Sequence, residues 1–312
     1  MVLRIPYSKK CYVIVETPQN PYNTEDPVSV RETLQSWDVD GVFLSYNQGF
    51  GERDRFYEYY SALEDYIENL GFIVNTFGPY FSDYTTTACT TGEDISGWIN
   101  PYLIYKNGIN FDSRYKNMLD NLIEYLNRYP LGEGMVLFDH VRYPQGNSYC
   151  PNCSVQTWQN RIYNVTQATS IVKSYISNNA NISTQNFGGV LHPQRNSTNN
   201  TCYQAWNVGQ AYDDTKGITR HLGFVAMMLY SIPREDYIQW MYNLARYGDS
   251  YDGYSTSGTN KELLILLSTY PTTYSYYDTL QTVIDDALNY FEGIVFWEYQ
   301  SLKDTFGGIQ RY

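Results

Sequence analysis

Short apolar runs alternate with segments of helical periodicity along almost the whole chain. An apolar run bounded by polar or turn-forming residues is typical of a strand that is buried on both faces. The predicted strands cover residues 12–16, 41–45, 72–75, 134–139, 182–191, 223–230, 263–268 and 293–298, and Gly188 and Gly189 interrupt the fifth. Apolar positions with a helical period predict helices at residues 29–37, 53–69, 113–128, 155–177, 234–247 and 277–290, with a short closing helix after the last strand.

Eight strands separated by helical segments in 312 residues predict an α/β fold, a single (β/α)8 TIM barrel that forms one domain over residues 1–312. A doubly wound sheet is the alternative, and it usually carries a glycine-rich phosphate loop after its first strand. The sequence Glu-Thr-Pro-Gln-Asn-Pro at 16–21 does not resemble such a loop. Long loops are expected after the third, fourth and fifth strands, and loops of this length are often functional.

Composition narrows the range of partners. A net charge of −12 without a basic cluster argues against nucleic acid as a partner, because binding to phosphate needs clustered cations. No apolar stretch reaches the roughly 18 residues needed to span a membrane, and Met1–Lys10 lacks the apolar core of a signal peptide. The 34 tyrosines provide flat amphipathic faces that suit sugar rings and also suit a resistant extracellular surface.

Cysteines and glycosylation motifs suggest an exported protein, located outside the cell or on a virion or cell surface. We expect Cys11 to be free and buried in the first strand. The loop cysteines Cys89, Cys150, Cys153 and Cys202 favour disulfides over a zinc or redox site, with three pairings open. Asn-x-Ser/Thr motifs lie at Asn152, Asn164, Asn181, Asn196 and Asn199.

Three carboxylates follow barrel strands and are expected to meet at one mouth, because parallel strands end on the same face: Glu16, Asp139 and Glu298. Glycoside hydrolysis uses two carboxylates, one as an acid and one as a nucleophile or base. A nearby Arg142 would keep Asp139 ionised. The predicted substrate-binding residues are those around the same strand ends: Arg142, Tyr143, His140, Tyr46, Asn47, Tyr230 and Trp297.

Simpler roles are open for most of these residues. Asp139 can cap a turn or pair with Arg142, and Glu16 and Glu298 can bind backbone amides. His140 and His192 fit ordinary hydrogen-bonded loop histidines. Asp213 and Asp214 are expected on a solvated loop, and a position over the mouth is the alternative. No metal-binding motif and no cofactor-binding motif is present, so neither a metal nor a cofactor is predicted.

Two motifs carry a family resemblance. The fourth strand, Gly-Met-Val-Leu-Phe-Asp-His-Val-Arg-Tyr-Pro at 134–144, and the sixth, Phe-Val-Ala-Met-Met-Leu-Tyr at 224–230, resemble those of a glycosyl-hydrolase-like TIM-barrel family that is distantly similar to the alpha-amylase type of barrel. Gln210 resembles part of that family's segment between strands five and six. The resemblance implies a (β/α)8 fold, action on a polysaccharide or glycan, and Asp139 as a catalytic carboxylate.

The chain departs from the family pattern where His140 replaces a tyrosine, Met227 replaces a proline, and Leu222-Gly223 replaces an acidic residue. The second carboxylate must therefore come from elsewhere, with Glu298 and Glu16 as candidates. The leading hypothesis is a secreted glycoside hydrolase that cleaves an extracellular or cell-surface glycan. The alternative is a catalytically altered barrel that serves as a structural or glycan-binding part of an appendage, virion or surface layer, with self-assembly.

Overall fold

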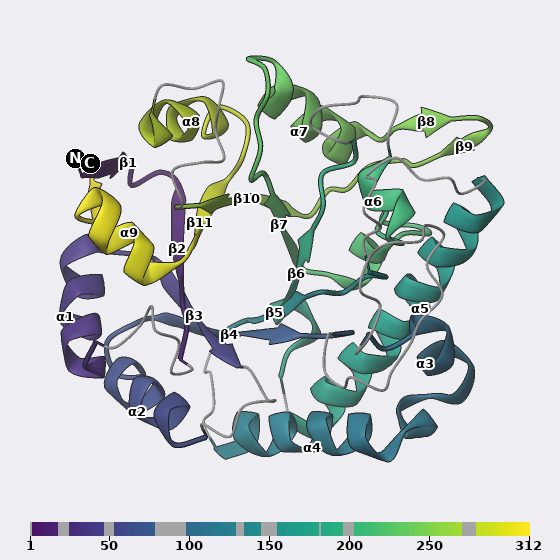
Figure 1. Ribbon diagram of the computed structural model, residues 1–312, viewed down its shortest axis with the longest axis horizontal. Helices are drawn as coiled ribbons and strands as arrows, with labels where there is room; N and C mark the ends of the chain where they lie inside the picture. Colours follow the sequence, from purple (N-terminus) through teal and green to yellow (C-terminus); the bar gives the residue numbers. More distant parts are fainter. Residues whose placement is uncertain are drawn as a thin grey trace.

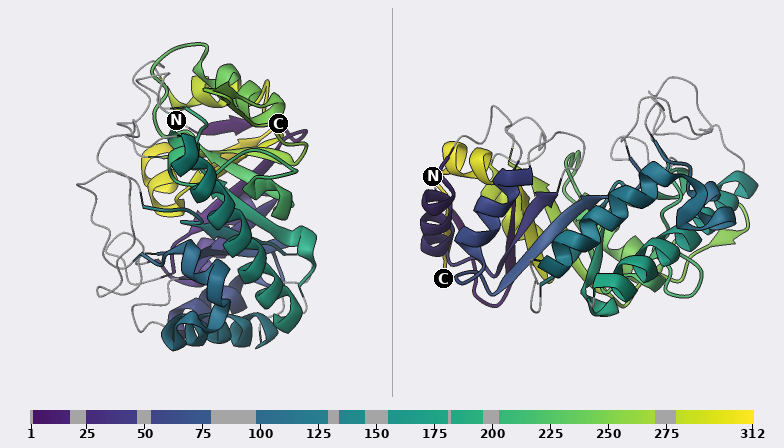
Figure 2. Two further views of the ribbon diagram at one scale, coloured as in Figure 1. Left: turned by 90° about the vertical axis from the view of Figure 1, so that its right-hand side faces the viewer. Right: turned by 90° about the horizontal axis from the view of Figure 1, so that it is seen from below.

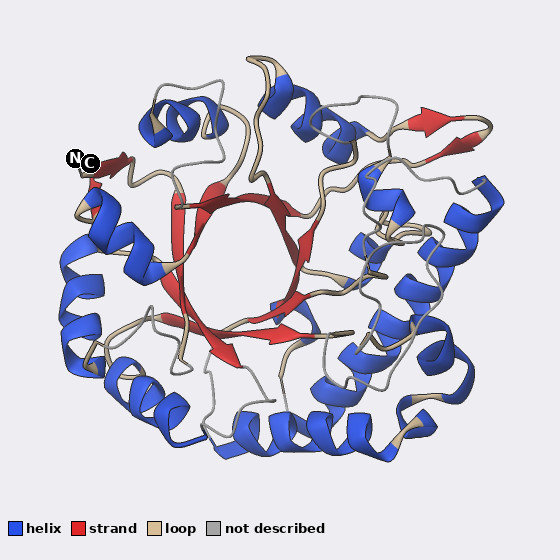
Figure 3. Ribbon diagram, viewed as in Figure 1, coloured by secondary structure: helices blue, strands red, loops and turns tan. Residues whose placement is uncertain are grey.

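The computed structural model describes residues 2–17, 25–46, 53–78, 98–128, 134–144, 155–180, 182–195, 203–269 and 279–312. Eight parallel strands close into a barrel in the order β10-β11-β2-β3-β4-β5-β6-β7 (Figure 3). Each barrel strand overlaps one predicted strand: β2 (Lys10–Val15), β3 (Gly41–Tyr46), β4 (Asn69–Asn75), β5 (Val136–Asp139), β6 (Phe187–Leu191), β7 (Phe224–Met228), β10 (Glu262–Ser268) and β11 (Gly293–Trp297). The prediction of a (β/α)8 barrel is confirmed.

Helices surround the barrel (Figure 1) and pack on its outer face through a continuous apolar layer. They are α1 (Pro27–Trp37), α2 (Arg53–Leu63), α3 (Pro101–Asn107), α4 (Ser113–Arg128), α5 (Val155–Ala180), α6 (Gln204–Asn207), α7 (Tyr237–Tyr247), α8 (Leu280–Ala287) and α9 (Tyr299–Phe306). Short 3-10 turns lie at Ile109–Phe111, Thr184–Asn186 and Ile218–His221. The side views show α5 running along the flank of the barrel beside α3 and α4 (Figure 2).

The first and last strands of the chain lie side by side outside the barrel, near α1 and α8 (Figure 1). There β1 (Leu3–Ile5) pairs in parallel with β12 (Ile309–Arg311). Arg311 secures this contact, since its Nη1 donates to Asp40 Oδ2 at 2.8 Å and its Nη2 donates to the Lys9 carbonyl at 2.8 Å. A small hairpin of β8 (Ser250–Tyr251) and β9 (Tyr254–Ser255) lies between α7 and β10 in the chain. Cys11 is buried and free, as predicted.

The largest differences from the predicted boundaries lie at the end of the second helix and at the start of the fifth strand, which begins at Phe187 instead of residue 182. The second helix ends at Leu63 instead of residue 69, because Asn69 already pairs with Gly41 of β3 and opens β4. Gly71 lies inside β4. The fifth strand is continuous through its two glycines.

Aromatic side chains fill the interior of the barrel and explain one of those glycines. Tyr12 lies 5.6 Å from Phe43, and Phe43 stacks on Phe224 at 6.3 Å between ring centroids. A Cβ at Gly188 would lie 2.2 Å from Cζ of Phe224, so the ring occupies the space that a side chain at this position would need. Glycine therefore lets β6 and the Phe224 ring approach closely.

We expect Gly188→Ala to lower the free energy of unfolding by about 1–3 kcal/mol through overpacking. Urea denaturation would measure the loss. Phe224→Leu supplies the control, because the smaller side chain leaves room for the new methyl group. The cost of Gly188→Ala should therefore shrink in the Phe224→Leu background. Equal costs in both backgrounds would contradict this account.

Candidate active site at the barrel mouth

Alternation along the strands places one ring of side chains at the mouth. Every second residue of a strand faces the same side. Asn75, Asp139 and His192 each lie two residues beyond an interior residue of β4, β5 and β6. Glu16 and Trp297 hold the corresponding positions after Ile14 of β2 and Val295 of β11. These five side chains therefore lie at the carboxyl end of the barrel, where (β/α)8 enzymes build their active sites.

Asp139 lies at the centre of a hydrogen-bonded cluster. It is paired in register with Asn75, and its carboxylate Oδ1 accepts the backbone N–H of His140 at 2.7 Å. His140 Nδ1 lies 2.7 Å from Asn75 Oδ1 and 3.2 Å from Asp139 Oδ2. Since both neighbours are acceptors, Nδ1 of His140 carries the proton and links the two strand ends.

The surroundings of Asp139 favour its ionised form. Burial alone would raise the pKa of Asp139, but the charges of His140 and Arg142 and the hydrogen bonds from His140 outweigh burial and lower the pKa below its usual value. His140 has a positive φ of 49°. This left-handed conformation turns the chain immediately after β5 and brings the His140 ring back towards Asp139. The charge of Arg142 lowers the pKa of Asp139, in the direction that the sequence predicted.

Trp98, which lies in the connection between β4 and α3, packs against this cluster. The Arg142 guanidinium lies 4.6 Å from the Trp98 ring centroid, and the His140 ring meets Trp98 edge-on at 5.4 Å. Trp98 is buried, and it contacts both basic side chains beside Asp139. Sequence reasoning missed Trp98 because it lies in a long loop with no period to mark it.

Tyr143, one of the predicted substrate-binding residues, packs inside the protein. The ring is buried, and the Arg161 guanidinium lies 5.0 Å from its centroid. Its hydroxyl donates to Asn100 Oδ1 at 3.1 Å and accepts from Asn164 Nδ2 at 3.2 Å. Tyr143 therefore packs the loop after β5 against α3 and α5. The hydrogen-bonded Nδ2 of Asn164 is also the atom that an N-linked glycan would have to use.

Glu298 caps a helix. It is 2% exposed, its Oε1 accepts the Ser301 N–H at 2.8 Å, and its Oε2 accepts the Gln300 N–H at 3.2 Å. This is the simpler role that the sequence left open, and Glu298 is the N-cap of α9. Burial raises the pKa of Glu298, the two amides oppose that rise, and the charges of Glu16 and Asp304 add to it.

The barrel order separates two groups of carboxylates. Glu298 and Glu16 follow neighbouring strands, β11 and β2, whereas β5, which ends in Asp139, is four strands away from β11 and so lies across the barrel from it. The structure therefore brings Asp139, His140, Arg142 and Asn75 together, and it brings Glu16 near Glu298. All three follow strands that end at the same face of the barrel, and a direct approach of their carboxyl groups to one another stays a prediction.

The remaining predicted residues have simpler placements. Tyr230 and Trp297 are half-buried and pack against the barrel interior. Only the backbone of Tyr46 is described, at the end of β3. Asp213, expected on a solvated loop, is 1% exposed and accepts the backbone N–H groups of Thr215 and Ser257. Outside the described residues lie Asn47, Cys89, Cys150, Cys153, Cys202, Asn152, Asn181, Asn196 and Asn199.

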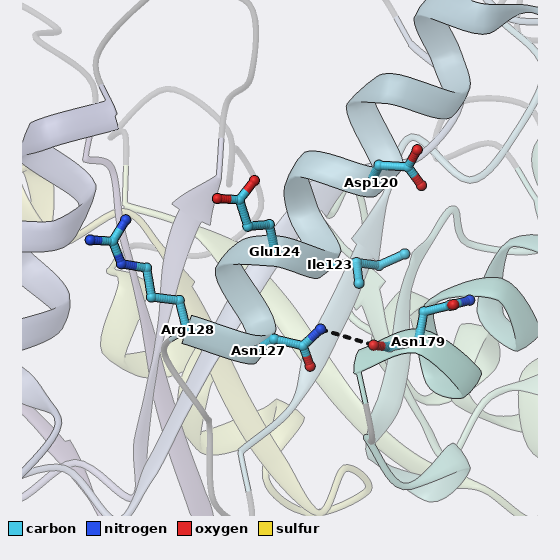
Figure 4. A pocket seen from close by; sticks show the side chains of 6 residues that line it. All are labelled: Asp120, Ile123, Glu124, Asn127, Arg128 and Asn179. Atoms are coloured by element: carbon cyan, nitrogen blue, oxygen red, sulfur yellow. Dashed lines mark hydrogen bonds between the residues drawn. The ribbon is translucent and has the colours of Figure 1, made fainter.

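A further pocket lies outside the barrel between α4 and α5 (Figure 4). Its lining consists of Asp120, Ile123, Glu124, Asn127, Arg128 and Asn179, and Asn127 Nδ2 donates to the Asn179 carbonyl at 2.9 Å. These are the later turns of both helices, so the pocket lies away from the mouth. In the described part of the chain, no group of three or more His, Cys, Asp or Glu residues could hold a metal ion. No helix there is long and apolar enough to cross a membrane.

Comparison with known proteins identifies the fold class. No protein-family model and no curated protein sequence matches the chain. Among solved structures, the glycoside hydrolase domain of PgaB (BpsB) from Bordetella bronchiseptica aligns with a TM-score of 0.60, 10% identity, and 95% of this chain against 96% of that chain. A GH18 chitinase from Pseudoalteromonas aurantia gives 0.54 and 10% identity over 95% and 98% of the two chains.

The mannanase man26 from Bacillus subtilis gives a TM-score of 0.52 and 12% identity over 96% of this chain and 80% of that chain. At such identities the likeness shows the fold alone. The chain is a (β/α)8 barrel of the kind found in these glycoside hydrolases.

The lowered pKa of Asp139 predicts a pH-dependent contribution to stability. A carboxylate whose folded-state pKa lies below its unfolded value of about 3.9 stabilises the fold above that pH, and the contribution disappears as the pH falls through the folded pKa. We expect Asp139→Asn to be destabilised relative to wild type at pH 7 and the difference to shrink towards pH 3. Urea denaturation across this range measures it.

The control for this experiment is Asp236→Asn, since the Asp236 side chain is 66% exposed in a surface pair with Arg234. Surface pairs contribute about 0–1 kcal/mol, so this variant should follow wild type at both pH values. A difference for Asp139→Asn that is constant with pH would contradict the account.

Proposed function

We propose that the protein is a glycoside hydrolase that cleaves a polysaccharide or glycan at the barrel mouth, with Asp139 as its ionised catalytic carboxylate. The observation that carries the proposal is the environment of Asp139. The side chain points towards the mouth from the end of β5, and His140 and Arg142 keep it ionised despite its burial.

An ionised carboxylate suits one half of the reaction. It can attack the anomeric carbon, activate a water, or stabilise the positive charge of an oxocarbenium-like transition state. It cannot protonate the leaving oxygen, so a second group must act as the acid. The described part of the mouth offers Glu16 for this role, because alternation directs Glu16 inward whereas both oxygens of Glu298 are hydrogen-bonded to the first turn of α9.

The fold neighbours support a polysaccharide as the substrate. One carries the name of a chitinase, one of a mannanase, and one of a glycoside hydrolase domain. Chitin and mannan are both β-linked polymers, so they are the first substrates to test. The Asn-x-Ser/Thr glycosylation motifs and the loop cysteines support an extracellular location. Peptide mapping under non-reducing conditions and glycan analysis of the protein from its source would test this location. Free thiols together with bare asparagines would argue against it.

A second candidate function is a glycan-binding or structural barrel without catalysis. The observation that favours it is the capping role of Glu298, which leaves Asp139 without this partner across the mouth. Binding of oligosaccharides by wild type without release of reducing ends would support this alternative.

We expect Asp139→Asn to lower the rate of reducing-end release from colloidal chitin or mannan at least a hundredfold, since a single acid–base or nucleophilic group contributes about 10²–10⁴-fold. Asparagine preserves the size of the side chain and one acceptor oxygen, and it removes the charge and the second acceptor. Asp236→Asn is the matched control and should keep full activity. Equal activity of both variants would remove Asp139 from the mechanism, and folded but inactive wild type would favour the binding alternative.

The identity of the second carboxylate can be tested with a matched pair of variants. We expect Glu16→Gln to lower kcat at least a hundredfold with little change in the thermal midpoint, because Glu16 faces the mouth. Glu298→Gln should lower kcat less than tenfold and should reduce stability by about 1 kcal/mol through a weaker helix cap. The reverse pattern would assign the acid to Glu298.

A further inference from the structure

His192 is a buried histidine at the mouth of the barrel. It follows the last residue of β6 and is 6% exposed. Nε2 of its ring is buried and has no hydrogen-bond partner among the residues that the structure describes. Buried polar atoms in native proteins are almost always hydrogen-bonded, so an exception calls for an explanation.

The rest of His192 is firmly held. Its backbone N–H donates to Gln210 Oε1 at 2.8 Å, and its carbonyl accepts from the Tyr212 hydroxyl at 2.8 Å. The ring Nδ1 lies 2.9 Å from Gln204 Nε2. Because an amide nitrogen only donates, Nδ1 is the acceptor and the proton of the neutral ring lies on Nε2. The unpartnered atom is therefore a hydrogen-bond donor in a fixed position.

The ring belongs to the same region as Asp139. β6 is the neighbour of β5, and alternation directs both side chains to the mouth. Burial lowers the pKa of His192 well below its usual value; the charges of Arg142 and His140 lower it further, and the charge of Asp139 opposes them. His192 is thus a neutral hydrogen-bond donor at physiological pH. It is not suited to act as an acid or a base, because it does not take up a second proton.

We propose that His192 is a specificity-determining residue, and that its Nε2–H donates a hydrogen bond to an uncharged acceptor oxygen, a hydroxyl or an amide carbonyl, of the sugar bound beside Asp139. This inference rests on the function proposed above. Because Nε2 is buried in the structure, sugar binding has to uncover it. A site with a buried donor rejects ligands that lack the acceptor, because the donor is then left unpaired.

The test uses binding, so that it does not depend on turnover. The parent is Asp139→Asn, and the probes are N-acetylchitohexaose and mannohexaose, measured by isothermal titration calorimetry. His192→Met removes the donor at a similar side-chain length, and His192→Gln retains a donor at the end of the side chain. We expect His192→Met to weaken binding of the better probe about tenfold or more, and His192→Gln to remain within about threefold of the parent.

Ring ¹⁵N resonances give a readout that a purely structural role would not change. In the parent, the Nε2–H signal of His192, assigned by its loss in His192→Gln, should shift when the sugar is added, while Nδ1 stays unprotonated. This measurement holds even if His192→Met does not fold.

The outcomes separate the two proposals. Tight binding by a folded His192→Met, or a ring signal that sugar leaves unchanged, would overturn the role of His192 and leave the proposed hydrolase untouched. A parent that binds neither probe would overturn the role of His192 together with the proposed glycan site. If Nε2–H of His192 contacts an acetamido carbonyl, His192→Met should lose more affinity for the chito-oligosaccharide. If it contacts a hydroxyl, the variant should lose similar affinity for both probes.

Discussion

The packing of the barrel interior is the constraint on which the rest of the molecule depends. Eight strands close only if the side chains facing inward fill the centre, and here Tyr12, Phe43 and Phe224 supply much of that volume. Gly188 contributes by having no side chain where the Phe224 ring lies. Once the inward set is fixed, the two-residue period decides which residue at each strand end faces the mouth. The ring that contains Asp139 and His192 is therefore a consequence of the core.

Two acidic residues at the same end of the barrel show how environment decides chemistry. Both are largely buried, and burial by itself raises the pKa of each carboxyl group. Beside Asp139, two basic side chains and the turn at His140 reverse that effect. Beside Glu298, backbone amides oppose the rise while a second carboxylate adds to it, and the side chain serves to begin a helix. The difference arises from neighbours that are brought together by the turn after β5 and by the start of α9.

The fold leaves the function to be decided by the site. (β/α)8 barrels host many reactions. Likeness to chitinase, PgaB and mannanase structures at about 10% identity therefore shows a shared fold and not a shared reaction. The argument for glycan chemistry depends instead on Asp139, on the basic side chains that keep it charged, and on a buried histidine that presents a neutral donor beside it. These features belong to three neighbouring strands, β4, β5 and β6, and His140 lies within 2.7–3.2 Å of both Asn75 and Asp139.

The sequence by itself determined the barrel, its eight strands and Asp139 as the charged end of the fourth, because unbroken apolar runs and helical periods are local signals. It also predicted that Cys11 is buried. Tertiary structure decided the rest. The start of β4 at Asn69 depends on pairing with β3, a long-range contact that outweighs a helical pattern. The burial of Tyr143, the capping role of Glu298, and the places of Trp98 and His192 beside Asp139 depend on groups distant in the chain. Such long-range contacts produce no periodic pattern in the sequence. Only the folded chain therefore reveals which polar residues meet at the mouth and which form their hydrogen bonds elsewhere.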